Sequence, residues 1–443
     1  MRAPEPQHAP DGQSASWAPE LSAPLGALDP ELARLVDAEL ARQRATLDLT
    51  ASENLVPAAL LEVQGSVLTN KYADGYPGAR EYDGCAVVDE VERLAIQRAC
   101  ALFGAEHANV QPYSGSSANF AVLAALAEPG DTVLGWDFSH GGHPTHYDRD
   151  TLTGRVYRGV AYHVRRADRL VDMDEVAALA RAERPRVIFV GWCCYPRQLD
   201  YGAFRAIADE VGAFLVADMA HISGLVAAGL HPSPVGLADV CTFTTHKTLA
   251  GGRGGAILSR RALAGRIDAA VYPGSQGGPL PHVIAANALA FGLAARPAFA
   301  ERMERTLSGA RILAAALSAA ADETGCTVLS GGTEVHQVIL DASGSTRSAA
   351  ELLERLHDAS CDANALPLAY DPRPESGGSG LRLGTAALAT RGFDDAAFAE
   401  LGALLVAALA TRGAPRAGEL AEQARALTAR FPIYPGLRAA ALS

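Results

Sequence analysis

The chain has 443 residues, of which 49% are hydrophobic and 20% are charged, and its formal net charge is −12. This length exceeds what one hydrophobic core usually supports, so more than one domain is expected. Nucleic acid and anionic membrane surfaces bind clustered Lys and Arg, so the acidic balance argues against both as partners, and no apolar run is long enough to span a membrane. The seven Cys residues, an odd number in a long chain, fit the reduced thiols of a cytoplasmic enzyme better than a disulfide framework, and no CxxC pair offers a zinc site.

The N-terminal part of the chain is expected to lie outside the main core. Residues 1–20 are rich in Pro, Ala, Ser and Gln and predict a flexible leader. Apolar residues recur at helical spacing over 29–44 and predict an amphipathic arm within residues 21–60.

Short apolar runs then alternate with helical patterns, which predicts a large α/β domain over residues 61–290 with a mostly parallel sheet covered on both faces. Strands are predicted at 132–134, 187–190, 214–217, 240–243 and 256–258, and helices at 89–103, 118–126, 173–182 and 201–211. Residues 291–443 predict a smaller α+β domain. Its expected strands are 327–329, 335–340 and 380–383, and its expected helices are 349–358, 396–410 and 417–430.

Two charged residues follow apolar strands and suggest a cofactor site. Asp218 ends the run 214–217 at the edge where open α/β sheets usually bind ligands, and Lys247 follows the run 240–243. A buried Lys can form an imine with a carbonyl, and a buried carboxylate can pair with a pyridinium nitrogen. Both residues suit pyridoxal phosphate (PLP), although their spacing also fits an ordinary ion pair. The only other Lys is Lys71.

Two polar segments add to this pattern. The turn at 113–119 (YSGSSAN) opens a helix whose free N–H groups are able to bind a phosphate, although many such turns merely cap helices. The segment 140–146 (HGGHPTH) holds three His, but no HExxH spacing or Cys partner accompanies it, so a His that stacks on a planar cofactor is preferred to a metal site. No metal is expected.

Six linked motifs resemble the serine hydroxymethyltransferase family. They are 49–54 (LTASEN), 64–72 (QGSVLTNKY), 75–78 (GYPG), 109–112 (NVQP), 244–249 (TTHKTL) and 276–280 (QGGPL). The resemblance implies fold-type I of the PLP enzymes, an aspartate-aminotransferase-like α/β fold with a mostly parallel seven-stranded sheet and a smaller α+β C-terminal domain.

The resemblance also implies roles for individual residues. Lys247 would bind PLP as a Schiff base, Asp218 would hold the pyridinium nitrogen and His143 would stack on the ring. By position, the phosphate would be bound by Ser114, Gly115 and Ser116, and by Gly277 and Gly278 of a neighbouring subunit. The cofactor pocket would include His221, Thr244 and His246. The substrate carboxylate would be bound by Ser52 and Arg382, and the two active-site tyrosines of the family would be Tyr72 and Tyr82. A homodimer or tetramer with shared active sites is therefore expected.

Several positions depart from the family pattern around the second substrate. Asp74 stands where the family has an acid/base Glu, and its carboxylate reaches one methylene less far. The other departures are Phe138 and Pro144 in place of leucines, Tyr147 and Asp148 in place of small residues, Cys193 in place of Ser, Glu81 and Asp83 beside Tyr82, and a loop at 362–370 in which only Asn364 clearly survives.

These departures suggest that tetrahydrofolate is not the partner. The preferred interpretation is a threonine transaldolase of secondary metabolism, such as antibiotic biosynthesis, which converts L-threonine and an aldehyde into a new β-hydroxy-α-amino acid and acetaldehyde. Folate-dependent serine hydroxymethyltransferase in one-carbon metabolism is the main alternative. Threonine aldolase, α-methylserine hydroxymethyltransferase and a PLP-binding protein without catalysis are further alternatives.

Overall fold

A computed structural model describes residues 18–371, 378–412 and 416–437. These residues form two compact units, 18–44 with 434–437, and 45–433. In the first unit, α1 (Leu25–Leu28) precedes α2 (Pro30–Ala45), which confirms the predicted arm helix, and Arg44 donates to the carbonyl of Tyr434 at 2.6 Å. Most of the predicted leader, residues 1–17, lies outside the described residues. The domain boundaries at 60 and 290 stay predictions.

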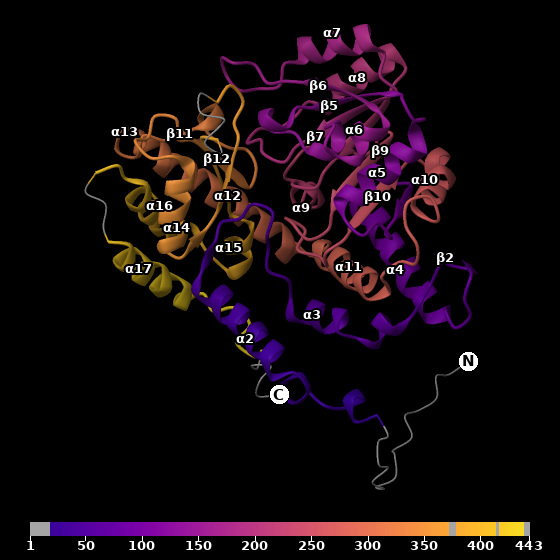
Figure 1. The fold of residues 1–443 in the computed structure, drawn as a ribbon, viewed down its shortest axis with the longest axis horizontal. Coiled ribbons are helices and arrows are strands. Elements are labelled where there is room, and N and C mark those ends of the chain that lie inside the picture. Colours follow the sequence, from indigo (N-terminus) through magenta and orange to yellow (C-terminus); the bar gives the residue numbers. More distant parts are fainter. Residues whose placement is uncertain (1–17, 372–377, 413–415, 438–443) are drawn as a thin grey trace. The chain divides into compact units, whose positions relative to one another are not determined.

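A seven-stranded sheet organises the larger part of the second unit (Figure 1). Its order is β4-β10-β9-β8-β7-β5-β6, and every strand runs parallel to the others except β10. The strands are β4 (His107–Asn109), β5 (Thr132–Trp136), β6 (Arg158–Tyr162), β7 (Val187–Gly191), β8 (Phe214–Asp218), β9 (Val240–Thr244) and β10 (Gly255–Ser259). The mostly parallel sheet is confirmed, whereas β4 and β6 at its two edges were not predicted.

Both faces of this sheet are buried. Successive residues of β7 and β8 alternate between two cores: Val187 and Val216 face one, while Ile188 and Leu215 face the other. Such strands read as continuous apolar runs because neither face meets water. The first core is covered by α5 (Gly115–Leu126) and α10 (Ala264–Val271); the second by α4 (Ala86–Phe103), α7 (Met173–Glu183), α8 (Tyr201–Val211), α9 (Ser223–Ala227) and α11 (Pro281–Ala294).

A second, four-stranded antiparallel sheet has the order β11-β12-β15-β14 and groups with the later helices (Figure 1). Its strands are β11 (Thr327–Val328), β12 (Gln337–Asp341), β14 (Asn364–Leu366) and β15 (Gly380–Gly384). The helices of this part are α12 (Pro297–Ala319), α13 (Ala321–Thr324), α14 (Ala349–Asp358), α15 (Ala386–Arg391), α16 (Asp395–Leu409) and α17 (Ala417–Arg430). Five of them, α12, α14, α15, α16 and α17, bury a common apolar core with the sheet.

The remaining elements are short. They are α3 (Ala58–Gln64), α6 (Leu152–Val156), the parallel pair β1 (Leu47–Asp48) and β13 (Cys361–Asp362), and the hairpin β2 (Gly75–Tyr76) with β3 (Ala79–Arg80). Within the described ranges no single helix is long and apolar enough to cross a membrane, although the bent pair α11 and α12 meets the length and composition criteria together. The same ranges contain no group of three or more His, Cys, Asp or Glu placed to hold a metal ion.

Candidate active site

A cavity of about 320 Å³ lies at the carboxyl ends of the central strands. Open α/β sheets bind ligands at this edge because loops there connect strands to helices on opposite faces. The structure brings nine of the predicted site residues to its wall: Ser52, Ser114, Gly115, Ser116, His143, Asp218, Thr244, His246 and Lys247. Residues from five separate segments thus face one space.

The N-terminus of α5 forms one end of this cavity. Ser114 is the N-cap, and its hydroxyl accepts a hydrogen bond from the N–H of Ser117 at 3.1 Å in a capping box. The N–H groups of Gly115 and Ser116 have no partner within the helix and carry its partial positive charge. A Cβ atom on Gly115 would lie 2.3 Å from Oγ1 of Thr244, so only glycine lets the helix start so close to β9. This end of the cavity suits a phosphate.

Asp218 is a buried carboxylate at the end of β8. Asn119 donates to it at 2.9 Å, His146 lies 3.0 Å away through Nε2, and the N–H of Ala220 donates at 2.9 Å. Burial alone would raise the pKa of Asp218, but the hydrogen bond and charge of His146 and the donation from Asn119 hold that pKa well below its usual range. An ionised carboxylate that faces a cavity favours a cationic ring nitrogen.

Lys247 lies in the turn after β9, where Asn54 donates to its backbone carbonyl at 2.9 Å. Its Nζ is 3.0 Å from Nε2 of His221. Burial lowers the pKa of Lys247, and the positive charges of Arg382 and Arg253 act in the same direction. Lys71, the other amine, donates instead to the carbonyl of Asp83 at 2.8 Å. A neutral amine is the form that attacks an aldehyde, so Lys247 is suited to that chemistry.

The three histidines of the segment 140–146 point to different places. His143 lines the cavity, and burial lowers its pKa to about 4, so its ring is neutral and free to stack. His146 is fully buried and contacts Asp218. His140 accepts from the N–H of Val164 and packs edge-on against Tyr370. The three rings therefore do not converge on one ion.

Two other predicted pocket residues lie just beyond the residues that line the cavity. His221 is buried behind Lys247. Arg382, on β15, donates through Nε to Oδ1 of Asn364 at 3.0 Å and through Nη1 to the carbonyl of Cys193 at 2.9 Å. These contacts fix the guanidinium of Arg382 in one orientation, as a bidentate site for a carboxylate requires.

Five predicted residues do not line this cavity and form a second cluster. Tyr72 and Tyr82 pack edge to face with ring centroids 5.1 Å apart, and about half of each side chain is exposed. A Cβ atom on Gly278 would lie 2.6 Å from Oδ1 of Asp74. Gly277 is exposed beside it. These residues therefore present a surface of their own.

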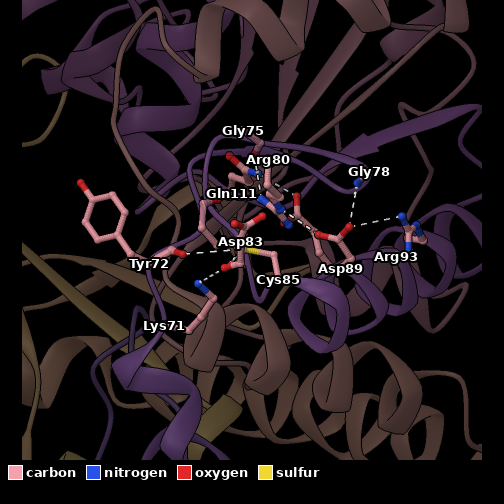
Figure 2. A network of polar contacts seen from close by, with 12 residues as sticks. Lys71, Tyr72, Gly75, Gly78, Arg80, Asp83, Cys85, Asp89, Arg93 and Gln111 are labelled. Carbon is pink, nitrogen blue, oxygen red and sulfur yellow. Dashed lines mark hydrogen bonds and ion pairs between the residues drawn. The ribbon is translucent and has the colours of Figure 1, made fainter.

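The hairpin that follows Asp74 is fixed by Arg80 (Figure 2). The buried guanidinium of Arg80 donates to the carbonyls of Ala73 and Gly75 at 2.8 and 2.7 Å and pairs with Asp89 at 2.8 Å and Glu92 at 2.6 Å. Figure 2 shows the ring of Tyr72 pointing away from Arg80 and its partners. Arg80 thus holds the backbone on both sides of Asp74.

Several residues that shape the site were not predicted from the sequence. Asn119 and His146 hold Asp218, Trp192 lines the cavity, and Gln337 contacts His221 at 2.9 Å. Asn119 faces the same side of α5 as Ser116, three residues earlier, so helical spacing from the phosphate turn was an available signal. Nothing in the sequence singles out Gln337.

Comparison with known proteins identifies the family. The family model described as serine hydroxymethyltransferase matches residues 25–405. The chain belongs to the serine hydroxymethyltransferase family. It is 54% identical over 414 residues to "Serine hydroxymethyltransferase" of Nocardia farcinica, which covers 93% of this chain and 96% of the relative. It is also 54% identical over 417 residues to "Serine hydroxymethyltransferase 2" of Mycobacterium tuberculosis (93% and 98%), and 52% identical over 430 residues to "Serine hydroxymethyltransferase 1" of that species (97% and 98%).

Members of the serine hydroxymethyltransferase family are PLP-dependent transferases of serine and glycine one-carbon metabolism. The cavity fits this cofactor in three respects. The N-terminus of α5 accepts a phosphate, the ionised Asp218 complements a protonated ring nitrogen, and the Nζ of Lys247 supplies an amine with a lowered pKa. The predicted PLP enzyme and its fold type are confirmed at the level of the family.

Proposed function

We propose that this protein transfers a hydroxymethyl group between L-serine and glycine with tetrahydrofolate as the second substrate. One observation carries the proposal: Lys247, Asp218 and the N-terminus of α5 line a single cavity. The names of the relatives point to hydroxymethyl transfer from serine. This replaces the threonine transaldolase interpretation as the leading function, because relatives that are 52–54% identical over nearly their whole length carry the other name.

The residues of the cavity have distinct tasks in this reaction. PLP, when bound, supplies an electron sink for negative charge at Cα of the amino acid. Lys247 would hold the aldehyde group of the cofactor through Nζ, and Asp218 would hold the proton on the ring nitrogen. His143 would support the ring, and Arg382 with Ser52 would bind the substrate carboxylate.

The groups that move protons come from the cavity wall and from the second cluster. Thr244 and His246 lie beside Lys247, and burial lowers the pKa of His246 to about 3, which keeps this ring neutral near pH 7. Asp74 and Tyr82 are the candidates to exchange a proton with the substrate hydroxyl. His221 contacts Lys247 directly.

The reaction is expected to take place in the cytoplasm, as the Cys usage favours.

We further propose that Tyr72, Asp74, Tyr82, Gly277 and Gly278 act at the cavity of a partner subunit in a homodimer or tetramer. Their own chain does not place them on its cavity wall, and the two tyrosines are about half exposed. In a symmetric pair each chain would then complete the other's site.

Subunit complementation tests this arrangement. Lys247→Ala and Asp74→Asn subunits are each expected to be inactive alone. Unfolded and refolded together in equal amounts, they are expected to regain about a quarter of the wild-type activity, because half of the dimers are hybrids with one intact site. No recovery in mixtures that contain hybrid dimers would refute the shared site.

Threonine transaldolase is the second candidate, and Asp74 favours it. Oδ1 of Asp74 is buried and has no hydrogen-bond partner among the described residues. The carboxylate of Asp74, which is one methylene shorter than the Glu of the family, therefore still lacks a hydrogen-bond donor. Phe138, a large ring that is 38% exposed, stands where the family has a leucine and adds apolar surface to the turn after β5. A larger aldehyde suits both features.

Two parallel assays decide between the candidates. The purified holoenzyme is given L-serine with tetrahydrofolate, and separately L-threonine with a panel of aldehydes. Folate-dependent formation of glycine from serine supports the hydroxymethyltransferase. Release of acetaldehyde from threonine that needs an added aldehyde but no folate would support the transaldolase and contradict the leading proposal.

A further inference from the structure

Gln337 is a fully buried amide on β12, behind the wall of the cavity. Its side chain contacts three groups: the N–H of Tyr195 at 3.2 Å, the carbonyl of Cys193 at 3.0 Å and Nδ1 of His221 at 2.9 Å. A buried amide with every contact satisfied is costly to replace and defines the geometry of its neighbours.

The two backbone contacts fix which end of the amide is which. The N–H of Tyr195 only donates, so the atom that faces it is the oxygen of Gln337. The carbonyl of Cys193 only accepts, so the atom that faces it is the nitrogen. The second N–H of this nitrogen must therefore donate to Nδ1 of His221.

His336 leads to the same conclusion about His221. Its Nε2 lies 3.1 Å from the carbonyl of Ala51, which only accepts, so Nε2 of His336 carries a proton. The same Nε2 lies 3.4 Å from Nδ1 of His221, and the two rings are nearly parallel. Burial lowers the pKa of His336 to about 3, so its Nδ1 carries no proton. Because the protonated Nε2 of His336 has no lone pair to accept a hydrogen bond, Nδ1 of His221 has no acceptor there and is left to accept from Gln337.

The proton of a neutral His221 must then sit on Nε2, which lies 3.0 Å from Nζ of Lys247. We propose that Gln337 is a positioning residue that fixes His221 as the Nε2–H tautomer, so that His221 donates to the lone pair of Lys247 and favours its neutral amine. The inference rests on the proposed role of Lys247 as the residue that binds PLP. Burial lowers the pKa of both His221 and Lys247, which agrees with two neutral groups in contact.

Gln337 also connects this pair to the site for the substrate carboxylate. The carbonyl of Cys193 accepts from Nε2 of Gln337 and from Nη1 of Arg382 at 2.9 Å. One backbone oxygen therefore sets the position of the amide that orients His221 and of the guanidinium of Arg382.

The test is ¹⁵N NMR of the histidine rings in protein freed of cofactor, compared with Gln337→Glu and Gln337→Met. Wild-type His221 is expected to give the Nε2–H pattern. The carboxylate of Gln337→Glu accepts rather than donates and is expected to convert His221 to Nδ1–H, while Gln337→Met is expected to give a mixture. The matched control is Gln111→Met, which removes another buried amide, bonded to Glu92, and leaves the His221 signals unchanged.

A second measurement follows the rate at which each protein binds added PLP at pH 7. A pKa rise of one unit in Lys247 would reduce its neutral fraction by up to about tenfold, so Gln337→Glu is expected to bind PLP more slowly, by up to about tenfold. An Nδ1–H pattern in the wild type, or no change in either Gln337 variant, would overturn the proposal. Failure of the wild type to bind PLP would instead refute the role of Lys247, and the tautomer result would stand.

Discussion

The amine of Lys247 and the imidazole of His221 lie 3.0 Å apart at the base of the cavity, and burial lowers the pKa of both groups, which favours their neutral forms. A neutral amine attacks an aldehyde once its lone pair leaves the N–H donor, so this contact bears directly on cofactor binding.

Replacement of Lys247 by Ala removes the group that we propose binds the cofactor aldehyde. The Lys247→Ala protein is expected to lack the visible absorbance of covalently bound PLP and to lose about 10³-fold or more in kcat. Absorption spectra and steady-state rates measure both. Lys71→Ala is the control, because Lys71 contacts only the carbonyl of Asp83 among the described hydrogen bonds and the band should persist.

Gly115 tests the close approach between α5 and β9. The new Cβ in Gly115→Ala would lie 2.3 Å from Oγ1 of Thr244, so the helix N-terminus must move and the affinity for PLP is expected to fall at least about tenfold. Fluorescence titration with PLP measures this. Gly265→Ala in α10 meets no atom within 4 Å and is expected to leave affinity unchanged and add up to about 1 kcal/mol of stability. Equal affinities in both variants would contradict the close-contact argument.

Arg80 is expected to be critical for the hairpin after Asp74. Arg80→Met leaves the buried carboxylate of Glu92 and that of Asp89 without their shared cation, and should lower the free energy of unfolding by about 3–5 kcal/mol. Urea denaturation measures the loss. Arg93→Met is the control: Arg93 is mostly exposed and pairs with Asp89 at 3.4 Å, so its loss should cost about 1 kcal/mol or less.

The buried His336 predicts a pH dependence of stability. Its pKa is lowered to about 3 in the folded chain, against about 6.5 when unfolded. Between these values the unfolded chain binds one more proton, so the free energy of unfolding falls as pH drops, by about 1.4 kcal/mol per pH unit for this group. Denaturation at several pH values should show that His336→Gln reduces this slope by about 1.4 kcal/mol per pH unit, which is the contribution of one proton. His357→Gln, whose side chain is 78% exposed, should leave the slope unchanged.

The central strands were predictable because both faces of the sheet are buried. The runs at 187–190 and 214–217 are apolar at every position, and the structure confirms them as β7 and β8. The edge strands β4 and β6 were missed since they carry His, Asn and Arg, whose side chains reach solvent or polar partners. Their place in the sheet depends on pairing with β10 and β5, which no local pattern contains.

The residues of the candidate site also divide into those that a local sequence pattern predicts and those that it does not. Asp218 and Lys247 were found because each follows an apolar strand, so local pattern and position coincide. Gln337 is one of two polar residues in β12, and its role depends on His221, which is far away in the chain. Such contacts emerge only once the two sheets are assembled.

The position of Lys247 between two distant arginines has a practical consequence for measuring cofactor occupancy. Trypsin cuts after Lys and Arg, and between Arg205 and Arg253 the only such residue is Lys247. Borohydride reduction of the bound cofactor would make its link to Lys247 permanent and block cleavage there. The fragment 206–253 would then report loaded protein and the fragment 206–247 empty protein, so one mass spectrum counts occupied sites without any assay of turnover.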